Sequence, residues 1–395
     1  MKKNCSYASQ RPAYFKAFLA TGIALSALMS APLLAQTSNP ADEKAESGDI
    51  IVTARRSDEK LQDVPVSVAA LGAEQLTEQR ILSEADLQIA TPGLILRQTS
   101  SNNQINFALR GQTVDAFSGT APAVVVYMNE VQVAGAGTQS FFDMQSIQVF
   151  KGPQGTLFGR NTTGGLINFV THKPTDAFEG YVSSQVENFD GRRIEGAVNV
   201  PITEGFGLRF AGHYLKRDGY TRNLEDGSRI DGRDQFTLRG SARFDRGSGT
   251  TIDAVVTYFK EDSNRANAVK TLCTPDATFG CSPNSVSTNF PQTNFLIDRF
   301  LLPNIVRPGT FSQNPADLRQ VRIDVLPEQK AEDFLATLEI NQDIGESLRL
   351  TSVTGYRDGE NSSVRDFDQA KKLRLGAVTR LDRTALVLAA EVDRV

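Results

Sequence analysis

Residues 147–171 read IQVFKGPQGTLFGRNTTGGLINFVT. At both ends of this segment apolar residues alternate with others, which is typical of β-strands. Five glycines lie among these 25 residues, where average usage predicts about two. Glycine at this density predicts backbone that bends sharply or packs closely against other backbone. Lys151, Gln154, Arg160 and Asn161 lie among the glycines, so the connection between the strands is polar and charged.

A phosphate-binding loop is the first alternative for such a glycine-rich segment. The Walker pattern needs Gly-Lys followed by Ser or Thr, whereas Gly165 is followed by Leu166. Gly135-Ala136-Gly137 begins like a dinucleotide-binding fingerprint, but Ser140 stands where the third glycine belongs. We therefore expect no nucleotide site.

The segment resembles the end of the plug domain of TonB-dependent outer-membrane receptors. In that family a run Gly-Pro-Gln-Gly-Thr-Leu-[Phe/Tyr]-Gly-Arg-Asn-x-x-Gly-Gly leads into the last plug strand, and the match here has no gap. The residues of the motif are Gly152, Pro153, Gln154, Gly155, Gly159, Asn161, Gly164 and Gly165. Shorter similarities occur in TPGL (91–94), LRG (109–111) and VYMNEV (126–131), where Asn129 and Glu130 replace the usual Asp and Gly of a turn.

The resemblance implies the fold class. It is an α+β plug domain over residues 61–174, followed over residues 175–395 by antiparallel transmembrane β-barrel strands, the N-terminal part of the barrel. The family closes a barrel of 22 strands, and only seven or eight fit after Phe178. We therefore expect the barrel of this chain to be incomplete and the chain to be truncated at its C-terminus.

Composition limits the functional classes. The chain has 395 residues, with 42 basic and 46 acidic side chains, so it has no basic surface that would bind nucleic acid. No stretch after the first 40 residues approaches 18 consecutive apolar residues, so no membrane-spanning helix is expected there; outer-membrane strands, which alternate, remain possible. Only His172 and His213 exist, and neither a metal-binding spacing nor a nucleophile motif occurs. We expect no metal, no cofactor and no enzymatic activity.

The N-terminus predicts export. Residues 1–35 have a basic start, an apolar core from Ala17 to Met29 and a small residue at Ala35, as in a signal peptide. Residues 36–60 read as a polar periplasmic linker. Within it lies a short β-branched run suited to adding a strand to another protein's sheet. It resembles the TonB box of the family and comprises Asp49, Ile50, Ile51, Val52, Thr53 and Ala54; the alternative is the first plug strand.

The plug segment predicts short alternating elements. Strands are expected over residues 63–71, 94–97, 105–110 and 123–133, and helices over residues 73–80 and 84–89. Ser83 is expected to cap the second helix, with Asp86 near the capping-box position. Pro92-Gly93 ends that helix.

From Phe178 onward the sequence alternates over about ten residues per strand. Phe206, Leu208, Phe210 and Tyr214 share one face, and Arg209 and His213 lie on the other. Residues 235–244, 252–258 and 334–341 repeat the pattern. It suits a sheet between lipid and a wet lumen, and equally a soluble sandwich with one solvated face.

Connection lengths separate these two interpretations. The connections 201–205, 245–249 and 343–347 are short, whereas 217–232 and 261–332 are long, and only the short connection 188–191 breaks this alternation. Short turns at one end and long loops at the other favour an outer-membrane barrel. Tyr181, Tyr214, Tyr258 and Tyr356 are expected near strand ends as interfacial aromatics. Cys273 and Cys281 fall in the longest loop and are expected to form a disulfide in an exported protein, with two free thiols as the alternative.

Four functions remain open. The first, implied by the resemblance, is energised uptake across the cell outer membrane: an extracellular small molecule, with iron chelates favoured, binds outside, and TonB of the inner-membrane TonB–ExbB–ExbD complex pulls the TonB box. In that case Arg110, Lys151 and Arg160 would be held by carboxylates on the barrel wall, as in the family, unless they are surface charges or pair within the plug. The others are a passive porin or adhesive barrel, which would not need residues 49–171, a secreted enzyme and a non-functional receptor fragment.

Overall fold

The computed structural model divides the chain into two units, residues 1–48 and 49–395. It describes residues 51–52, 59–62, 64, 66–98, 105–113, 121–133, 141–247, 249–265, 275–276, 280–281, 317, 319–321, 323, 325–345, 348–366 and 376–394. Everything below concerns these residues, which all belong to the second unit. The expected signal peptide, and Asp49, Ile50, Thr53, Ala54 and Cys273, lie outside them. Cys281 is described only as backbone, so the expected disulfide stays a prediction.

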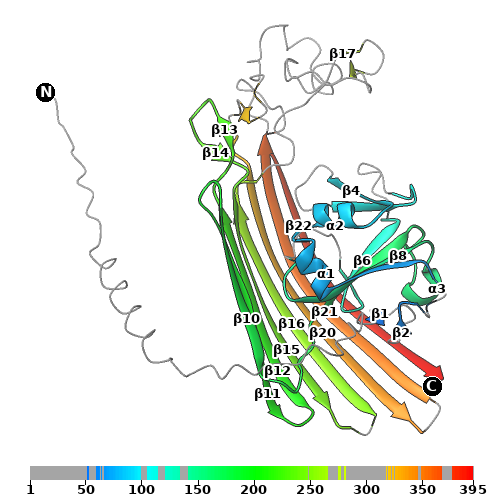
Figure 1. Cartoon of the computed structure of the whole chain (residues 1–395). Helices are drawn as coiled ribbons and strands as arrows, with labels where there is room; N and C mark the ends of the chain where they lie inside the picture. Colours follow the sequence, from blue (N-terminus) through cyan, green and yellow to red (C-terminus); the bar gives the residue numbers. More distant parts are fainter. Residues whose placement is uncertain are drawn as a thin grey trace, which may run out of the picture. The chain divides into compact units, whose positions relative to one another are not determined.

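The N-terminal part is an α+β domain around a mixed five-stranded sheet (Figure 1). The strand order is β3-β8-β9-β6-β7, with β6 parallel to β9 and the other pairs antiparallel. Two-stranded pairs β1-β2 and β4-β5 flank this sheet. The elements are β1 (Ile51–Val52), β2 (Glu59–Lys60), β3 (Val68–Gly72), α1 (Ala73–Glu78), α2 (Glu84–Ala90), β4 (Leu94–Gln98), β5 (Ile105–Leu109), β6 (Val124–Met128), β7 (Val131–Val133), β8 (Met144–Lys151), α3 (Gly155–Phe158) and β9 (Gly165–Thr171).

Apolar clusters cover both faces of this sheet. Val126 of β6 belongs to the larger one, together with Leu76 and Leu87 from the two longer helices. On the other face, Val125 and Phe150 pack with Val52 of β1, which is fully buried, and with Phe158 of α3. Alternate residues of β6 therefore enter different clusters, as the period of a strand requires.

Most predicted plug elements are confirmed, with two corrections. The first strand begins only at Val68, later than expected, and ends at Gly72, one residue beyond the predicted end. Residues 123–133 form a hairpin and not one strand, because Asn129 (φ 48°) and Glu130 (φ 65°) turn the chain between β6 and β7. Both residues adopt the left-handed conformation of a type I′ turn, which Asn tolerates and Glu rarely adopts.

Asp86 supports the start of α2, although not as a simple capping box. Its Oδ2 accepts hydrogen bonds from the Leu82 backbone N–H (3.1 Å) and the Ser83 hydroxyl (2.7 Å). Ser83 itself is the extended N-cap residue, but its side chain bonds no backbone N–H of the helix. The predicted position of the helix start is thus confirmed. The Asp86 side chain stabilises it, and not a hydrogen bond from the Ser83 side chain to the helix backbone.

Eight long antiparallel strands form the second part, here called the wall (Figure 1). Their order is β10-β11-β12-β15-β16-β20-β21-β22, and in the described residues the sheet is open at β10 and β22. The strands are β10 (Glu179–Glu187), β11 (Gly191–Thr203), β12 (Phe206–Arg217), β15 (Arg233–Asp245), β16 (Thr250–Ser263), β20 (Glu328–Ile344), β21 (Leu348–Asp366) and β22 (Gly376–Arg394). Short pieces β13 (Thr221–Asn223), β14 (Arg229–Ile230), β17 (Pro275–Asp276), β18 (Gly280–Cys281) and β19 (Gln320–Val321) lie within the two long connections.

The burial of the wall is inverted relative to a soluble sheet. On β12, Arg209 and His213 are buried, whereas Phe210 between them is 52% exposed. On β15, Arg239 is buried and Leu238 beside it is 56% exposed. The polar face of the wall therefore lies inward and the apolar face outward. A soluble sandwich would have the opposite arrangement, with the apolar face packed inward and the polar face in water.

A row of aromatic rings crosses the outer face. Tyr214 is the register partner of Phe236, and Tyr258 is the register partner of Phe334. The ring centroids of Phe236 and Tyr258 are 5.8 Å apart, and those of Phe334 and Tyr356 are 6.2 Å apart. The expectation of interfacial tyrosines near strand ends is wrong for Tyr356, which lies near the middle of β21 because the strand continues beyond the aromatic row. It is also wrong for Tyr181, which faces the inner side of the wall.

Among the described residues, no helix combines the length and the apolar character that a membrane span requires.

The glycine-rich segment packs backbone against backbone. Gly152 N–H donates to the Gly164 carbonyl (3.0 Å) and Gln154 N–H to the Thr162 carbonyl (3.1 Å), so the segment folds back on itself around α3. Gly165 has φ +140°, and a Cβ there would lie 2.1 Å from the Phe150 carbonyl oxygen. Only glycine fits this position.

We predict that Gly165→Ala destabilises the protein by about 3 kcal/mol, because the methyl group meets backbone and the conformation is strained. Gly155→Ala, in the same motif, meets nothing within 4 Å and should change stability by less than about 1 kcal/mol. Urea unfolding of both variants measures this, and equal effects would contradict the packing described.

Candidate functional site

The plug contacts the inner face of the wall through the residues just before β8. Asp143 has φ 50° and is buried. Its carboxylate accepts hydrogen bonds from Arg209 of β12, at 3.0 Å from Nε and 2.5 Å from Nη2. The side chains are 1% and 7% exposed, so this is a bidentate ion pair removed from water.

Arg239 and His213 hold the neighbouring residue Phe142. The Arg239 guanidinium lies 4.7 Å from the centre of the Phe142 ring, and its Nη1 donates to the carbonyl oxygens of Phe142 (3.2 Å) and Asp143 (3.3 Å). The His213 ring stacks on the same Phe142 ring, with the ring centroids 5.4 Å apart and an interplanar angle of 25°. Adjacent strands β12 and β15 thus bind two consecutive plug residues through charge, backbone and ring contacts.

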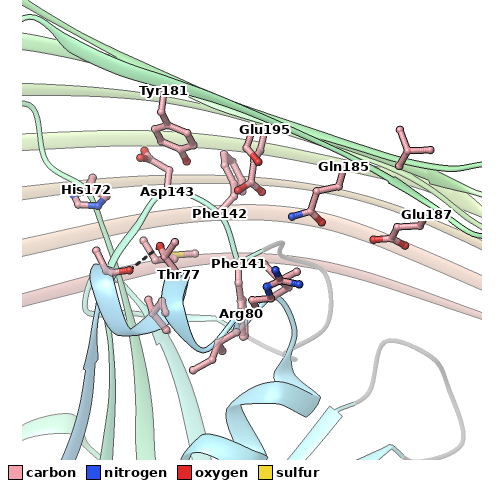
Figure 2. A pocket seen from close by; sticks show the side chains of 17 residues that line it. Thr77, Arg80, Phe141, Phe142, Asp143, His172, Tyr181, Gln185, Glu187 and Glu195 are labelled. Atoms are coloured by element: carbon pink, nitrogen blue, oxygen red, sulfur yellow. Dashed lines mark hydrogen bonds between the residues drawn. The ribbon is translucent and has the colours of Figure 1, made fainter.

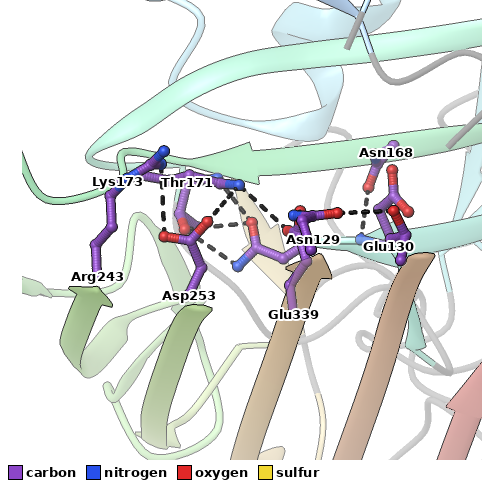
Figure 3. A network of polar contacts seen from close by, with 10 residues as sticks. Asn129, Glu130, Asn168, Thr171, Lys173, Arg243, Asp253 and Glu339 are labelled. Atoms are coloured by element: carbon purple, nitrogen blue, oxygen red, sulfur yellow. Dashed lines mark hydrogen bonds and ion pairs between the residues drawn. The ribbon is translucent and has the colours of Figure 1, made fainter. Parts of the chain in front are cut away.

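Lys173 makes a second anchor, after the end of β9. Its Nζ lies 2.8 Å from Asp253 Oδ2 of β16 and 3.2 Å from Glu339 Oε2 of β20. Arg243 Nη1 is 3.5 Å from the other oxygen of Asp253 (Figure 3). One ammonium therefore links the end of the plug to two neighbouring wall strands.

An apolar contact completes the attachment. Leu335 and Val353 of the wall belong to the same cluster as Val131 of β7. A Cβ placed on Gly355 would lie 2.2 Å from Val131 Cγ1, so the side chain rests directly on the wall backbone. The wall has a glycine where Val131 of the plug contacts it.

A cavity of about 1060 Å³ lies between α1 and the strands β10 and β11 (Figure 2). Thr77 and Arg80 face it from the plug, and Tyr181, Gln185 and Glu195 face it from the wall. A second cavity of about 670 Å³ surrounds the Lys173 anchor and reaches Gly249 and Asp343 at the short-turn end of the wall. The plug therefore fills the inner side of the wall incompletely.

His172 lies between the two anchors and lines both cavities. Burial lowers the pKa of this imidazole, and the nearby Asp143 carboxylate acts against that shift. The neutral form is therefore favoured in the folded protein.

The expected lock residues lie in the plug. Arg110 follows β5 with φ 51° and is exposed, and its Nη1 would be 3.3 Å from a Cβ on Gly152. Lys151 Nζ donates to the Pro92 carbonyl oxygen at 3.0 Å, which is a contact within the plug. Arg160 is exposed in the turn after α3. Their expected pairing with wall carboxylates stays a prediction.

Two residues of the expected TonB box are described. Ile51 and Val52 form β1, which pairs antiparallel with β2 through Ile51–Lys60 and Val52–Glu59. Val52 is fully buried against the plug sheet. In this structure the segment belongs to the plug, and its role as a partner-binding strand stays a prediction.

Sequence reasoning did not find the anchor residues Asp143, Arg239, Lys173, Asp253 and Glu339 as a group. Their only detectable signal is alternation, which places Arg239 and Glu339 on the polar face of strands. Arg209 and Asp143 are 66 residues apart, and no local pattern links them.

Comparison with known proteins fits this geometry. Residues 60–166 match the family model of the TonB-dependent receptor plug domain. The chain carries a TonB-dependent receptor plug domain. The resemblance drawn from residues 147–171 is thereby confirmed.

The curated relatives include the pesticin receptor of Yersinia pestis, 29% identical over 175 residues, which cover 44% of this chain and 26% of the relative. The vitamin B12 transporter BtuB of Vibrio vulnificus is 23% identical over 214 residues, which cover 50% of this chain and 32% of the relative. The chain thus spans about a quarter to a third of the length of these relatives.

The solved structures share the fold. The ferric yersiniabactin uptake receptor FyuA from Yersinia pestis superposes with a TM-score of 0.61 at 18% identity, covering 82% of this chain and 45% of that one. The expected fold class, a plug followed by antiparallel barrel strands, is confirmed, and the family is one of receptors.

We predict that Asp143→Asn destabilises the protein by about 3 kcal/mol, because it leaves the buried Arg209 charge with only the more distant and exposed carboxylate of Glu179, 3.8 Å from its Nη1. Asn keeps the size of the side chain and tolerates the left-handed backbone. Asp190, with φ 52° and an exposed side chain, is the matched control: Asp190→Asn should cost less than about 0.5 kcal/mol. Urea unfolding compares the two, and similar losses would show that the buried pair does not hold the plug.

We also predict that the protein loses stability as the pH falls from about 7.5 to about 5.5, since the pKa of His172 is lower folded than unfolded and the unfolded chain takes up the proton first. His172→Gln should lose less stability over that interval. Unfolding midpoints of both proteins at both pH values measure the difference. Both proteins contain His213, so any contribution of that residue is the same in each. An equal loss in both proteins would disprove the assignment.

Proposed function

We propose that this protein takes part in energised uptake of a scarce nutrient, an iron chelate, across the cell outer membrane. The observation that carries the proposal is a folded plug bound by buried ion pairs to the polar face of a sheet whose other face is apolar. The relatives support the ligand class: one is named as a ferripyoverdine receptor and one solved structure as a ferric yersiniabactin uptake receptor. Transport, and not catalysis, is what this arrangement serves.

The outer face of the wall fits a lipid bilayer. Phe206 and Phe244 are register partners near one end of β12 and β15, and Tyr214 and Phe236 are partners near the other. The nine residues from Phe206 to Tyr214 agree with the about 9–11 residues of a transmembrane β-strand. Just beyond the aromatic row come ion pairs such as Lys216–Asp234 (3.0 Å), as expected where lipid headgroups begin.

In this function the β1 segment is the contact for TonB of the TonB–ExbB–ExbD complex. In the part of the chain that the structure describes, this two-residue strand pairs with β2 and is short enough to be drawn away. Its backbone could then add to a sheet of the partner. Arg110, Lys151 and Arg160 are proposed to bind wall carboxylates, and the signal peptide over residues 1–35 is proposed to direct export.

The test is Ile51→Pro. Proline removes a backbone N–H that strand pairing with a partner requires, so uptake of a radiolabelled ferric chelate should fall at least about tenfold while binding to the cell surface is unchanged. Ile51→Thr keeps the N–H and the β-branched side chain and is the matched control.

If Ile51→Pro takes up iron at the rate of the control, residues 49–54 are not the point where energy enters. If the wild-type chain neither binds nor takes up any ferric chelate, the uptake proposal is wrong and the interpretation as a non-functional receptor fragment is favoured.

A further inference from the structure

A third cavity, of about 560 Å³, lies at the end of the wall that carries the long connections. Its lining comes from the ends of β12 and β16, the starts of β15 and β20, and the connection between β12 and β15. Each of these four strands is paired on both sides within the sheet. The cavity therefore lies among fully paired strands, away from the sheet edges at β10 and β22.

This cavity reaches the outer face of the wall. Lys216 lies two residues after Tyr214, and Asp234 lies two residues before Phe236, so both side chains share the face of the aromatic row. Lys216 and Asp234 are register partners whose ion pair measures 3.0 Å, and their side chains are 53% and 42% exposed. The cavity thus opens just beyond the aromatic row, at the depth where the proposed bilayer has its headgroups.

The lining contains more cationic charge than its ion pairs use. Its described charged residues are the cations Lys216, Arg217, Arg229 and Arg233 and the carboxylates Asp218, Asp234, Asp262 and Glu328. Lys216 pairs with Asp234, and Glu328 pairs with Lys330 of β20. In the part of the chain that the structure describes, none of the three arginines forms an ion pair, so three guanidinium groups remain against two carboxylates.

Two of these arginines lie opposite each other on neighbouring strands. Arg217 and Arg233 are register partners at the end of the β12–β15 ladder, where like charges are unfavourable. Burial lowers the pKa of Arg233 to about 10; the charges of Arg265 and Arg217 act in the same direction, and Glu261 opposes them. Nε of Arg217 is buried, and no described residue accepts a hydrogen bond from it. A bound anion would relieve this repulsion.

Other contacts hold the arginines in place. The guanidinium of Arg217 lies 5.3 Å from the centre of the Tyr220 ring. Asn264, after the end of β16, fixes the segment that carries Arg229: its Oδ1 accepts from the Gly232 N–H and its Nδ2 donates to the Arg229 carbonyl oxygen, both at 2.8 Å. A site whose groups are already ordered loses little conformational entropy when a ligand binds.

We propose that Arg217, Arg229 and Arg233 form a binding site for a phosphate group. A guanidinium presents a planar fork of donors that matches the geometry of phosphate oxygens. The cavity volume lies within the about 300–1,000 Å³ of small-molecule sites. The phosphate belongs either to a lipid headgroup of the surrounding membrane or to a soluble phosphate compound, and the same oxygens meet the arginines in both cases. The site does not require the uptake function proposed above.

The test measures phosphate binding by the full chain, purified and folded in detergent. Native mass spectrometry compares retention of dioleoyl phosphatidic acid with that of dioleoylglycerol, which differs from it by the phosphate. Calorimetric titration with inorganic pyrophosphate tests the soluble source. A lipid site should retain phosphatidic acid at least about tenfold better than dioleoylglycerol, whereas a site for soluble compounds should bind pyrophosphate.

Arginine variants assign the binding to this cavity. Arg217→Gln and Arg233→Gln should each weaken the observed phosphate binding at least about tenfold. Arg246, exposed in the short turn at the other end of β15, is the matched control, and Arg246→Gln should leave binding within about twofold. Without ligand, the unfolding midpoint of Arg217→Gln should equal or exceed that of the wild type, because one of two opposed like charges is gone. Weaker binding by this variant would then not result from misfolding.

The proposal is overturned if the wild-type chain binds neither probe. It is also overturned if Arg217→Gln and Arg233→Gln bind phosphate as well as Arg246→Gln does. Binding of phosphatidic acid alone assigns the site to a lipid headgroup, and binding of pyrophosphate assigns it to a soluble compound. These measurements use no iron chelate, so their outcome is separate from that of the uptake experiment.

Discussion

Two opposite charges that water does not reach, those of Asp143 and Arg209, set the relation between the plug and the wall. Either charge alone inside the protein would be strongly unfavourable, so each side chain requires the other. The plug supplies partners for Arg209 and Arg239, whereas Arg357 pairs with Asp333 within the wall. Most polar groups between the two aromatic ends of each strand face inward, so the outer face there is apolar.

The two anchors also divide the plug along the chain. Residues before β5 contribute helices and edge strands, whereas Val131, Asp143 and Lys173 contact the wall. A pull from the N-terminus meets the two-residue strand β1 first and the strand β3 next. A pull from the N-terminus therefore loads the elements of the plug in the order in which they occur in the sequence. The cavity beside α1 lies next to the elements that are loaded first.

Much of the fold was predictable because its determinants are local. The glycine-rich segment, the two helices and the alternation of β12, β15, β16 and β20 are properties of neighbouring residues, and the structure confirms them. The resemblance already indicated a turn at Asn129 and Glu130, but the strand was expected to run through residues 123–133 because Glu rarely adopts positive φ. The anchors were missed because Asp143 pairs with a residue 66 positions away, and alternation shows which face a side chain takes but not its partner.

In the function proposed above, the buried position of Val52 would limit how often the β1 segment is available to a partner. Exposing a buried valine costs about 1.5–3 kcal/mol, and 1.4 kcal/mol is a factor of about ten in population. At equilibrium the segment is thus released in a few per cent of molecules or fewer. In the proposed uptake function, empty receptors would therefore leave most of the energy-supplying partner unoccupied.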